Sequence, residues 1–303
     1  MKKTVALILA LLLAAVSFVS LASCGTASSS NKVKVIDIPL TVEEYAYAVS
    51  KGNSDLLAQL NEFLNEIKTN GKFDEIVNKY YGDGTPTAVQ SASAMKNDGS
   101  QLIVATNAAF EPFEYLVGEN YYGIDMEIMD LFAKKLGKEL YINNMEFDAV
   151  CLSVSSSGGT YTDESGREVS VAGGVCDVAA AGLTVTDVRK QILDFSASYY
   201  NAAQVLIVSE SDTTFDKCQT PDEVMTILDT FDKSVKVGVQ NGTTGYFFCI
   251  GDEDWGFEGY KFDTVGYANG ALAVQNILNG NVKYVIIDEG PAKAITKNVN
   301  ASN

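Results

Sequence analysis

The sequence has no histidine and few basic residues: 22 Lys and Arg stand against 39 Asp and Glu, which gives a net charge of -17 at pH 7. Without histidine, neither a histidine-based catalytic triad nor a histidine metal site can form, and no Cys-x-x-Cys pair indicates zinc. The excess of acidic residues works against nucleic acid or an anionic membrane as a partner. These absences exclude the classes of enzyme that depend on a catalytic or metal-binding histidine.

Long low-complexity tracts are also absent. The chain has 303 residues, 47% of them hydrophobic, which is enough length and apolar surface for two globular lobes. We therefore expect a folded, two-lobed protein.

The longest apolar run lies at the start of the chain. Residues 1–23 combine two lysines, an apolar run at 5–16 and a Leu-Ala-Ser end before Cys24, the pattern of a secretory signal. Leu-Ala-Ser-Cys resembles the bacterial lipoprotein processing box, which implies that Cys24 carries a lipid. An uncleaved membrane anchor is the alternative, because residues 5–22 are just long enough to span a bilayer. Residues 24–32 are expected to be a tether.

Hydrophobic periodicity predicts alternating strands and helices over most of the remaining chain, which indicates parallel βα units. The segment 83–100 is rich in Gly, Ser, Thr and Ala with little periodicity and is expected to be a linker. Strands are expected at 32–38, 45–49, 102–106, 140–142, 178–181, 204–208, 235–239 and 284–287, and helices at 54–67, 73–80, 124–136, 147–154 and 271–278.

The first candidate binding motif is Phe110-Glu-Pro112-Phe113, just after a predicted strand. Proline breaks regular structure and holds the two phenylalanines in an irregular loop, where their faces can stack on a ligand. An aromatic pair packed in the core is the alternative.

The second motif lies between Asp177 and Lys190, where an apolar strand ends, Gly182 turns the chain and a helix is expected to open at 187–190. This arrangement presents Thr184 and Arg189 at the carboxyl end of the strand. The arginine fork matches a carboxylate in two parallel hydrogen bonds, so the stretch predicts a carboxylate cradle. A surface ion pair at a helix start is the alternative.

Two further stretches follow strands in the second half of the chain. In residues 240–245, Gln240-Asn-Gly-Thr-Thr244-Gly, backbone N–H groups at a helix start attract anions, but no lysine follows to make a nucleotide loop; a plain turn is the alternative. Asp288 ends the last strand, where a simple helix N-cap is the alternative to a ligand contact.

Four cysteines remain after Cys24. Cys151 and Cys176 flank an expected surface hairpin at 155–173, and such a pair can form a disulfide in an exported protein. Two buried thiols are the alternative, and the same question applies to Cys218 and Cys249.

In order and spacing, Phe110-x-Pro-Phe-Glu, Gly182-Leu-Thr-Val-Thr-Asp-Val-Arg189 and Gly242-Thr-Thr-Gly with a late Ile-Ile-Asp288 resemble the polar amino-acid-binding proteins of ABC importers, a family of extracytoplasmic solute-binding proteins. The resemblance spans nearly all of residues 101–300. It implies a type II periplasmic-binding-protein fold, with two α/β lobes joined by a two-strand hinge and a ligand in the cleft. It also implies capture of a free amino acid and delivery to an ABC permease, without a cofactor or catalysis.

The resemblance also implies roles for individual residues. Arg189 and Thr244 would hold the α-carboxylate of the ligand, and Asp288 its α-ammonium. Family members that take basic amino acids tend to have a carboxylate where Asn107 stands, and Gln240 is neutral too, so a neutral ligand side chain is expected. The full predicted ligand-binding set is Asn107, Phe110, Phe147, Gly182, Thr184, Arg189, Gln240, Thr244 and Asp288.

The chain departs from the family in its order. A segment resembling residues 32–82 comes last in the family and first here, so we expect a circular permutant whose usual ends are joined by the linker 83–100. Lobe 1 would comprise 43–82 and 101–205, and lobe 2 would comprise 33–42 and 206–303. A monomer is expected, and a domain-swapped dimer is the alternative.

Two other functions stay open at this point. A sensor subunit could bind the same ligand without transport. An enzyme of the dehydratase type on this scaffold would need a carboxylate facing its substrate, for which Glu114 is the only weak candidate.

Overall fold

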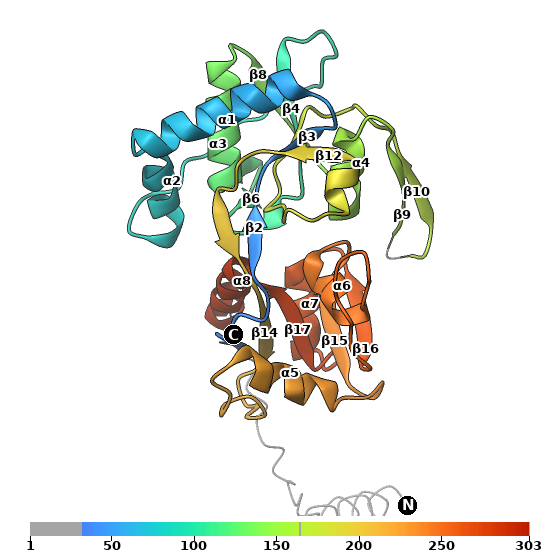
Figure 1. Cartoon of the computed structure of the whole chain (residues 1–303). Coiled ribbons are helices and arrows are strands. Elements are labelled where there is room, and N and C mark those ends of the chain that lie inside the picture. Colours follow the sequence, from blue (N-terminus) through green and yellow to red (C-terminus); the bar gives the residue numbers. More distant parts are fainter. Residues whose placement is uncertain (1–31, 164, 303) are drawn as a thin grey trace, which may run out of the picture. The chain divides into compact units, whose positions relative to one another are not determined.

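The structure is a computed structural model that describes residues 32–163 and 165–302. The predicted signal sequence and the predicted lipidation site Cys24 lie outside these residues. The helices in chain order (Figure 1) are α1 (Ser54–Thr69), α2 (Lys72–Tyr81), α3 (Ile124–Lys135), α4 (Phe147–Val154), α5 (Pro221–Asp229), α6 (Thr244–Ile250), α7 (Gly270–Leu278) and α8 (Glu289–Ser302).

Lobe 1 contains a five-stranded sheet with the order β12 (Leu193–Phe195), β3 (Ala48–Ser50), β11 (Val178–Ala179), β4 (Gln101–Thr106) and β8 (Glu139–Asn144). β11, β4 and β8 run parallel, and β3 is antiparallel to both of its neighbours. Every residue of β4 is buried, because alternate side chains join a core with α3 and a core with α4.

Lobe 2 contains a second five-stranded sheet with the order β1 (Val33–Ile36), β14 (Gln204–Ser209), β17 (Tyr284–Asp288), β15 (Lys236–Gln240) and β16 (Asp263–Tyr267). β17, β15 and β16 are parallel, and β14 is antiparallel to both β17 and β1. In β14, Val205 and Ile207 face one core and Leu206 and Val208 face the other, so this strand is buried on both sides.

Two antiparallel strands connect the lobes. β2 (Glu43–Tyr45) pairs with β13 (Tyr200–Ala202), with Tyr45 opposite Tyr200. Figure 1 shows both strands running between the two sheets. The chain passes from β1 through β2 into β3 of lobe 1, and from β13 into β14 of lobe 2, so the pair provides the predicted two-strand connection.

The first described segment contributes to both sheets. The α1 and α2 helices pack on lobe 1, where the ring of Phe63 lies 5.2 Å from that of Phe132. β1 lies at the edge of the lobe 2 sheet. The backbone N–H of Val33 donates to Asn300 Oδ1 at 2.9 Å, and Asn300 Nδ2 donates back to the Val33 carbonyl at 2.8 Å. The two ends of the described chain are therefore neighbours.

Smaller elements complete lobe 1. β5 (Ala109–Phe110), β6 (Glu114–Val117) and β7 (Asn120–Tyr122) form a three-stranded sheet, and β9 (Gly159–Thr162) with β10 (Glu168–Val171) forms a hairpin within the region where one was predicted. The helix predicted to open at 187–190 is wrong: this stretch ends in a 3-10 turn, η1 (Arg189–Gln191), that leads into β12 after a single turn.

The four described cysteines are all free thiols, so of the two alternatives for Cys151 and Cys176 the structure shows thiols and not a disulfide. The sulfur of Cys176 accepts a hydrogen bond from Asn143 Nδ2 at 3.4 Å, and Cys151 lies within α4. Burial raises the pKa of the Cys151, Cys176 and Cys249 thiols, which keeps them protonated. The first pair is therefore two thiols, with Cys176 buried and Cys151 partly buried.

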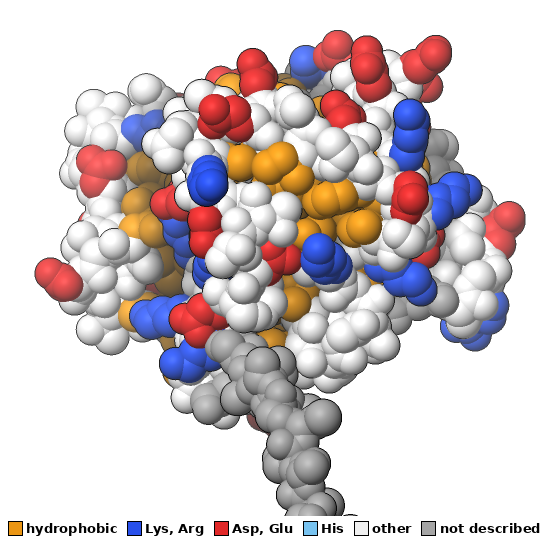
Figure 2. All heavy atoms as spheres, turned by 90° about the horizontal axis from the view of Figure 1, so that it is seen from below, with side chains coloured by type: hydrophobic (Ala, Val, Ile, Leu, Met, Phe, Trp, Pro, Cys, Tyr) orange, Lys and Arg blue, Asp and Glu red, His pale blue; other side chains and the backbone are white. Residues whose placement is uncertain are grey.

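Acidic and basic side chains mix on the face of the molecule seen from the side of α5, where they surround a group of hydrophobic side chains (Figure 2). Within residues 32–163 and 165–302, no helix has the length and hydropathy needed to cross a membrane.

Candidate functional site

Arg189 lies at the junction of the two lobes and is only 6% exposed, which rules out the surface ion pair. Its Nη1 donates to the Thr184 carbonyl at 2.8 Å in its own lobe, and Nη2 donates to the Gly242 carbonyl of lobe 2 at 3.2 Å. The guanidinium carbon lies 5.5 Å from the Phe147 ring centre and 5.1 Å from that of Trp255. Aromatic rings from both lobes therefore flank this cation.

The hydroxyls of Thr184 and Thr244 come from different lobes and meet at one carboxylate. Each donates to Oε2 of Glu43 at 2.7 Å. Thr244 is the first residue of α6, as the glycine-threonine stretch predicted, and Thr184 follows β11. The arrangement provides paired donors for a carboxylate, and an internal glutamate uses them.

Asp288 lies at the carboxyl end of β17 and is 4% exposed. Burial and, after it, the negative charge of Glu43 raise the pKa of its carboxyl group to about 7, against the opposing effect of the hydrogen bond from Tyr45. The Tyr45 hydroxyl donates to Oδ1 of Asp288. The carboxylate is thus a poorly solvated anion that an incoming cation would stabilise.

Asn107 and Gln240 also meet across the lobes. Nε2 of Gln240 donates to Oδ1 of Asn107 at 3.2 Å, and Nδ2 of Asn107 donates to the Met145 carbonyl at 2.7 Å. Oε1 of Gln240 is buried without a hydrogen-bond partner among the described residues. Gln240 Oε1 can therefore accept a hydrogen bond from a bound ligand.

Gly182 and Phe110 touch at the floor of the site. Gly182 has φ +52°, and a Cβ on it would lie 2.7 Å from the Phe110 ring, so only glycine fits. The Gly182 N–H donates to Asp125 Oδ2 at 3.0 Å. Phe110 packs 6.1 Å from Phe113 in the core, whereas Phe147 faces Arg189. Of the two predicted ligand-stacking aromatics, Phe110 therefore packs in the hydrophobic core and Phe147 lies against the guanidinium group of Arg189.

Several residues of the site were missed in the sequence. Glu43, Tyr45 and Gln204 come from the connecting strands and β14, and Trp255 comes from the loop after α6. Glu43 and Tyr45 lie in the displaced segment 32–82, for which the sequence predicts no binding role. The chain's single tryptophan was a signal that could have been followed.

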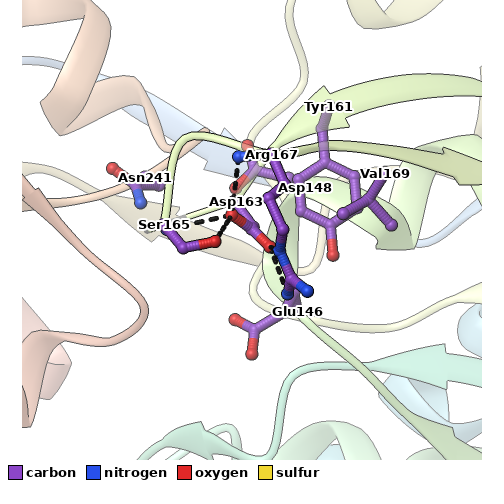
Figure 3. Close-up of a pocket in the computed structure, with 8 residues that line it drawn as sticks. All are labelled: Glu146, Asp148, Tyr161, Asp163, Ser165, Arg167, Val169 and Asn241. Atoms are coloured by element: carbon purple, nitrogen blue, oxygen red, sulfur yellow. Dashed lines mark hydrogen bonds and ion pairs between the residues drawn. The ribbon is translucent and has the colours of Figure 1, made fainter.

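A cavity of about 440 Å³ lies between the start of α4, the β9–β10 hairpin and Asn241 of lobe 2. Figure 3 shows its lining, in which Ser165 and Arg167 both donate to Asp163 while Asn241 comes from the other lobe. Glu146 and Asp148 add carboxylates. Burial raises the pKa of the Asp148 carboxyl group to about 6. The cavity is acidic.

The model of the bacterial extracellular solute-binding proteins, family 3, matches residues 7–83, 102–158 and 160–294. The chain belongs to this family. The prediction of a solute-binding protein, made from motifs at 110–114, 182–189 and 242–288, is confirmed.

Relatives in this family are named for basic amino acids. The chain is 33% identical to the arginine-binding extracellular protein ArtP of Bacillus subtilis over 132 residues, which are 42% of this chain and 45% of ArtP. It is 27% identical to a protein of Neisseria gonorrhoeae named as a histidine-binding protein, over 72% of this chain and 68% of that protein. The chain thus spans less than half of ArtP.

Solved structures support the fold. The amino acid ABC transporter substrate-binding protein AbpA of Streptococcus pneumoniae, bound to L-arginine, has a TM-score of 0.50 at 30% identity and covers 65% of this chain and 71% of its own. The ancestral amino acid-binding protein AncCDT-1, a precursor of cyclohexadienyl dehydratase, has a TM-score of 0.51 at 25% identity and covers 65% and 74%. The predicted α/β, type II periplasmic-binding-protein fold is confirmed.

Proposed function

We propose that this protein captures a free amino acid outside the cytoplasm and delivers it to an ABC permease. One observation carries the proposal: Arg189 and Asp288 are both buried, and among the described residues their side-chain hydrogen bonds go to backbone carbonyls and to the Tyr45 hydroxyl and not to a side chain of opposite charge. Buried charges without partners are costly, and a zwitterion supplies a partner of opposite sign to each. Family membership and the amino-acid names of the relatives support the same ligand class.

In this proposal the ligand's α-carboxylate binds the Arg189 fork and the Thr244 hydroxyl, and its α-ammonium binds Asp288. Thr184 and Gly182 line the carboxylate side. Charge-assisted bonds of this kind are short and strong in a dry cleft. The remaining members of the predicted set, Asn107, Phe110, Phe147 and Gln240, would surround the ligand side chain.

A neutral ligand side chain is the first candidate. Asn107 and Gln240 are uncharged amides, and the free Oε1 of Gln240 suits an N–H or O–H donor. A charged side chain against these amides would lose hydration without gaining an opposite charge. Glutamine, asparagine, serine and threonine are the ligands to test first.

Arginine is the second candidate, and one observation favours it. The acidic cavity is lined by Glu146 and Asp148, the two sequence neighbours of Phe147. If arginine is the ligand, Asp148→Asn should weaken its binding, whereas the same variant should leave binding of a neutral amino acid within about twofold. That pair of measurements decides between the two candidates.

A thermal-shift screen of the free amino acids tests the proposed function. A ligand present at 100 times its dissociation constant adds about 2.7 kcal/mol to the free energy of unfolding. We expect a clear rise in melting temperature for one chemical group of amino acids and none for matched sodium chloride. No shift with any amino acid, together with no heat of binding by calorimetry, would contradict the proposal.

Attachment of the protein through a lipidated Cys24 belongs to the same proposal. More than one acyl chain is needed for firm attachment, as a lipidated N-terminal cysteine provides. Cys24→Ala should be released from membranes or should keep its leader. A fully processed Cys24→Ala protein that stays on membranes would oppose the anchor.

We also propose that the chain is a circular permutant and a monomer. The paired hydrogen bonds between Val33 and Asn300 place the ends of the described chain side by side. A circular permutant requires this, because its new ends lie where the family's continuous chain has been opened. Light scattering should give the mass of one chain at all concentrations. A dimer that persists on dilution would favour a domain swap instead.

We propose a binding protein rather than an enzyme. Glu114, the weak candidate for catalysis, is fully buried beside Asp125, and burial raises the pKa of its carboxyl group well above the ordinary value. A dehydratase would need this carboxyl group to face the cleft, whereas the Glu114 side chain is fully buried. Incubation with prephenate should leave the substrate unchanged by absorbance.

A further inference from the structure

Glu43 is a buried glutamate with an unusually complete set of donors. Its Oε2 accepts from Thr184 and Thr244 at 2.7 Å each, and its Oε1 accepts from Thr41 Oγ1 at 2.7 Å and from Gln204 Nε2 at 3.1 Å. The residue is 7% exposed. Hydrogen-bond donors to both oxygens stabilise a buried charge that burial alone would disfavour.

Two of these donors belong to the carboxylate side of the proposed cleft: the Thr244 hydroxyl, which the proposed function gives to the ligand, and the Thr184 hydroxyl beside it. Thr184 belongs to lobe 1 and Thr244 to lobe 2, so one oxygen of Glu43 joins the two lobes. Glu43 itself lies on β2, the strand that connects them. The carboxylate side of the proposed cleft is therefore bridged by a carboxylate that the chain supplies.

We propose that Glu43 is an internal competitor of the ligand: its side-chain carboxylate takes the place of the ligand's α-carboxylate at the Thr184 and Thr244 hydroxyls and must leave when an amino acid binds. The inference rests on the proposed function and names a further residue that sets its affinity.

An amino acid can displace Glu43 because Glu43 binds the threonine hydroxyls of the site and pairs with neither of its two charged groups. Both guanidinium hydrogen bonds of Arg189 go to backbone carbonyls, so its charge is left for the ligand. Asp288 likewise has no cationic partner among the described residues. A free amino acid supplies a carboxylate to the first and an ammonium to the second, which Glu43 cannot do.

The Glu43 side chain borders a cavity that can accommodate it after displacement. A cavity of about 630 Å³ is lined by Glu43, by Thr184 and Thr244, and by the loop that carries Trp255. The preceding residue on the chain, Val42, is 99% exposed. A rotation of the Glu43 side chain into this cavity would exchange four protein donors for water.

Departure of Glu43 would also improve the partner of the ligand's ammonium group. The negative charge of Glu43 is the second cause, after burial, of the raised pKa of Asp288. When that charge moves away, the ionised form of Asp288 becomes more favourable, and this form binds an ammonium group. Exchange at one end of the ligand thus supports binding at the other.

Glu43→Ala tests the inference, with Glu44→Ala as its matched control. Glu44 is the adjacent residue, has the same charge and is exposed, so it reports the loss of one negative charge without the loss of the competitor. Calorimetry with the amino acid that gives the largest thermal shift should show at least tenfold tighter binding for Glu43→Ala. Glu44→Ala should stay within twofold of the unmodified protein.

Glu43→Gln provides a second variant if the alanine variant does not fold. The amide keeps the shape of the side chain but removes the charge, so tighter binding is expected here as well. Unchanged affinity in both Glu43 variants would show that no competition exists. Weaker binding, as expected for Asp288→Asn, would make Glu43 a direct ligand contact, and either result overturns the inference.

The same experiment separates this inference from the proposed function. If the unmodified protein binds an amino acid and the Glu43 variants bind it no more tightly, only the competitor is wrong. If the unmodified protein binds no amino acid, and both Glu43 variants bind none, then the proposed function and the inference fail together.

Discussion

The hydroxyl of Tyr45 donates to Oδ1 of Asp288 across 2.5 Å, and both residues are buried. Tyr45 belongs to β2, which connects the lobes, and Asp288 to the end of β17 in lobe 2. The bond therefore holds Asp288, the proposed partner of the ligand's ammonium group, against the connecting strand β2. It leaves the carboxyl group with a pKa of about 7, so its charge changes near neutral pH.

Ligand affinity should depend on pH through Asp288. An ammonium group needs the ionised carboxylate, and below pH 7 the unliganded protein must release a proton to provide it. The dissociation constant should rise by up to about tenfold per pH unit as pH falls below 7. Calorimetry between pH 5 and 8 measures this dependence. Asp288→Asn should bind weakly with a flat profile; an equally steep profile in that variant would contradict the assignment.

The unliganded protein should respond to pH in the opposite direction. The pKa of Asp288 is raised to about 7, and those of Asp125 and Asp148 to about 6. Between about pH 4 and 7 these groups bind protons in the folded state that the unfolded state lacks, so this contribution to stability is present at the acid end and is lost as pH rises. Urea unfolding at pH 5.5 and 7.5 should therefore show greater stability at pH 5.5.

Gly182→Ala should destabilise the protein by about 1–3 kcal/mol, because it combines a left-handed backbone with a collision against Phe110. Gly137→Ala is the matched control: Gly137 has φ +68°, but a Cβ there meets nothing within 4 Å. Denaturant unfolding should show the larger loss at Gly182. Equal losses would mean that the contact with Phe110 is not tight.

Trp255 should report ligand binding by its fluorescence. It is the only tryptophan, and its ring lies 5.1 Å from the guanidinium carbon of Arg189 and stacks on Phe247 at 4.1 Å. A carboxylate bound to Arg189 changes the electric field at the indole, so emission should change with a saturable dependence on amino-acid concentration. A silent titration at concentrations where calorimetry records binding would place the ligand away from this cation.

The elements predicted best from the sequence were those with long apolar patterns. The runs in β4, β14 and β17 are buried on both faces, and such strands appear as continuous hydrophobic stretches. Helix α5 was missed although Thr220 and Glu223 form a capping box around Pro221, because its local signal is confined to one turn.

The site could be predicted only in part. Thr184, Arg189 and Thr244 stand in recognisable motifs at strand ends, and the structure brings them to one place. Glu43 could not be predicted as a site residue, because two adjacent glutamates are expected to be solvent-exposed. Its burial depends on contacts with both lobes that the sequence does not show. The state of the cysteines stayed open for a related reason: whether two sulfurs meet depends on distances that sequence spacing does not give.

The most direct test of the proposed function is the calorimetric affinity of Arg189→Ala for the amino acid that stabilises the unmodified protein. Lys190→Ala removes a neighbouring exposed cation and serves as the control. The proposal predicts a loss of about 2–5 kcal/mol in binding free energy for Arg189→Ala, because the ligand carboxylate would lose its fork in a closed cleft, and no loss for Lys190→Ala. An Arg189→Ala protein that folds and binds with unchanged affinity would contradict it.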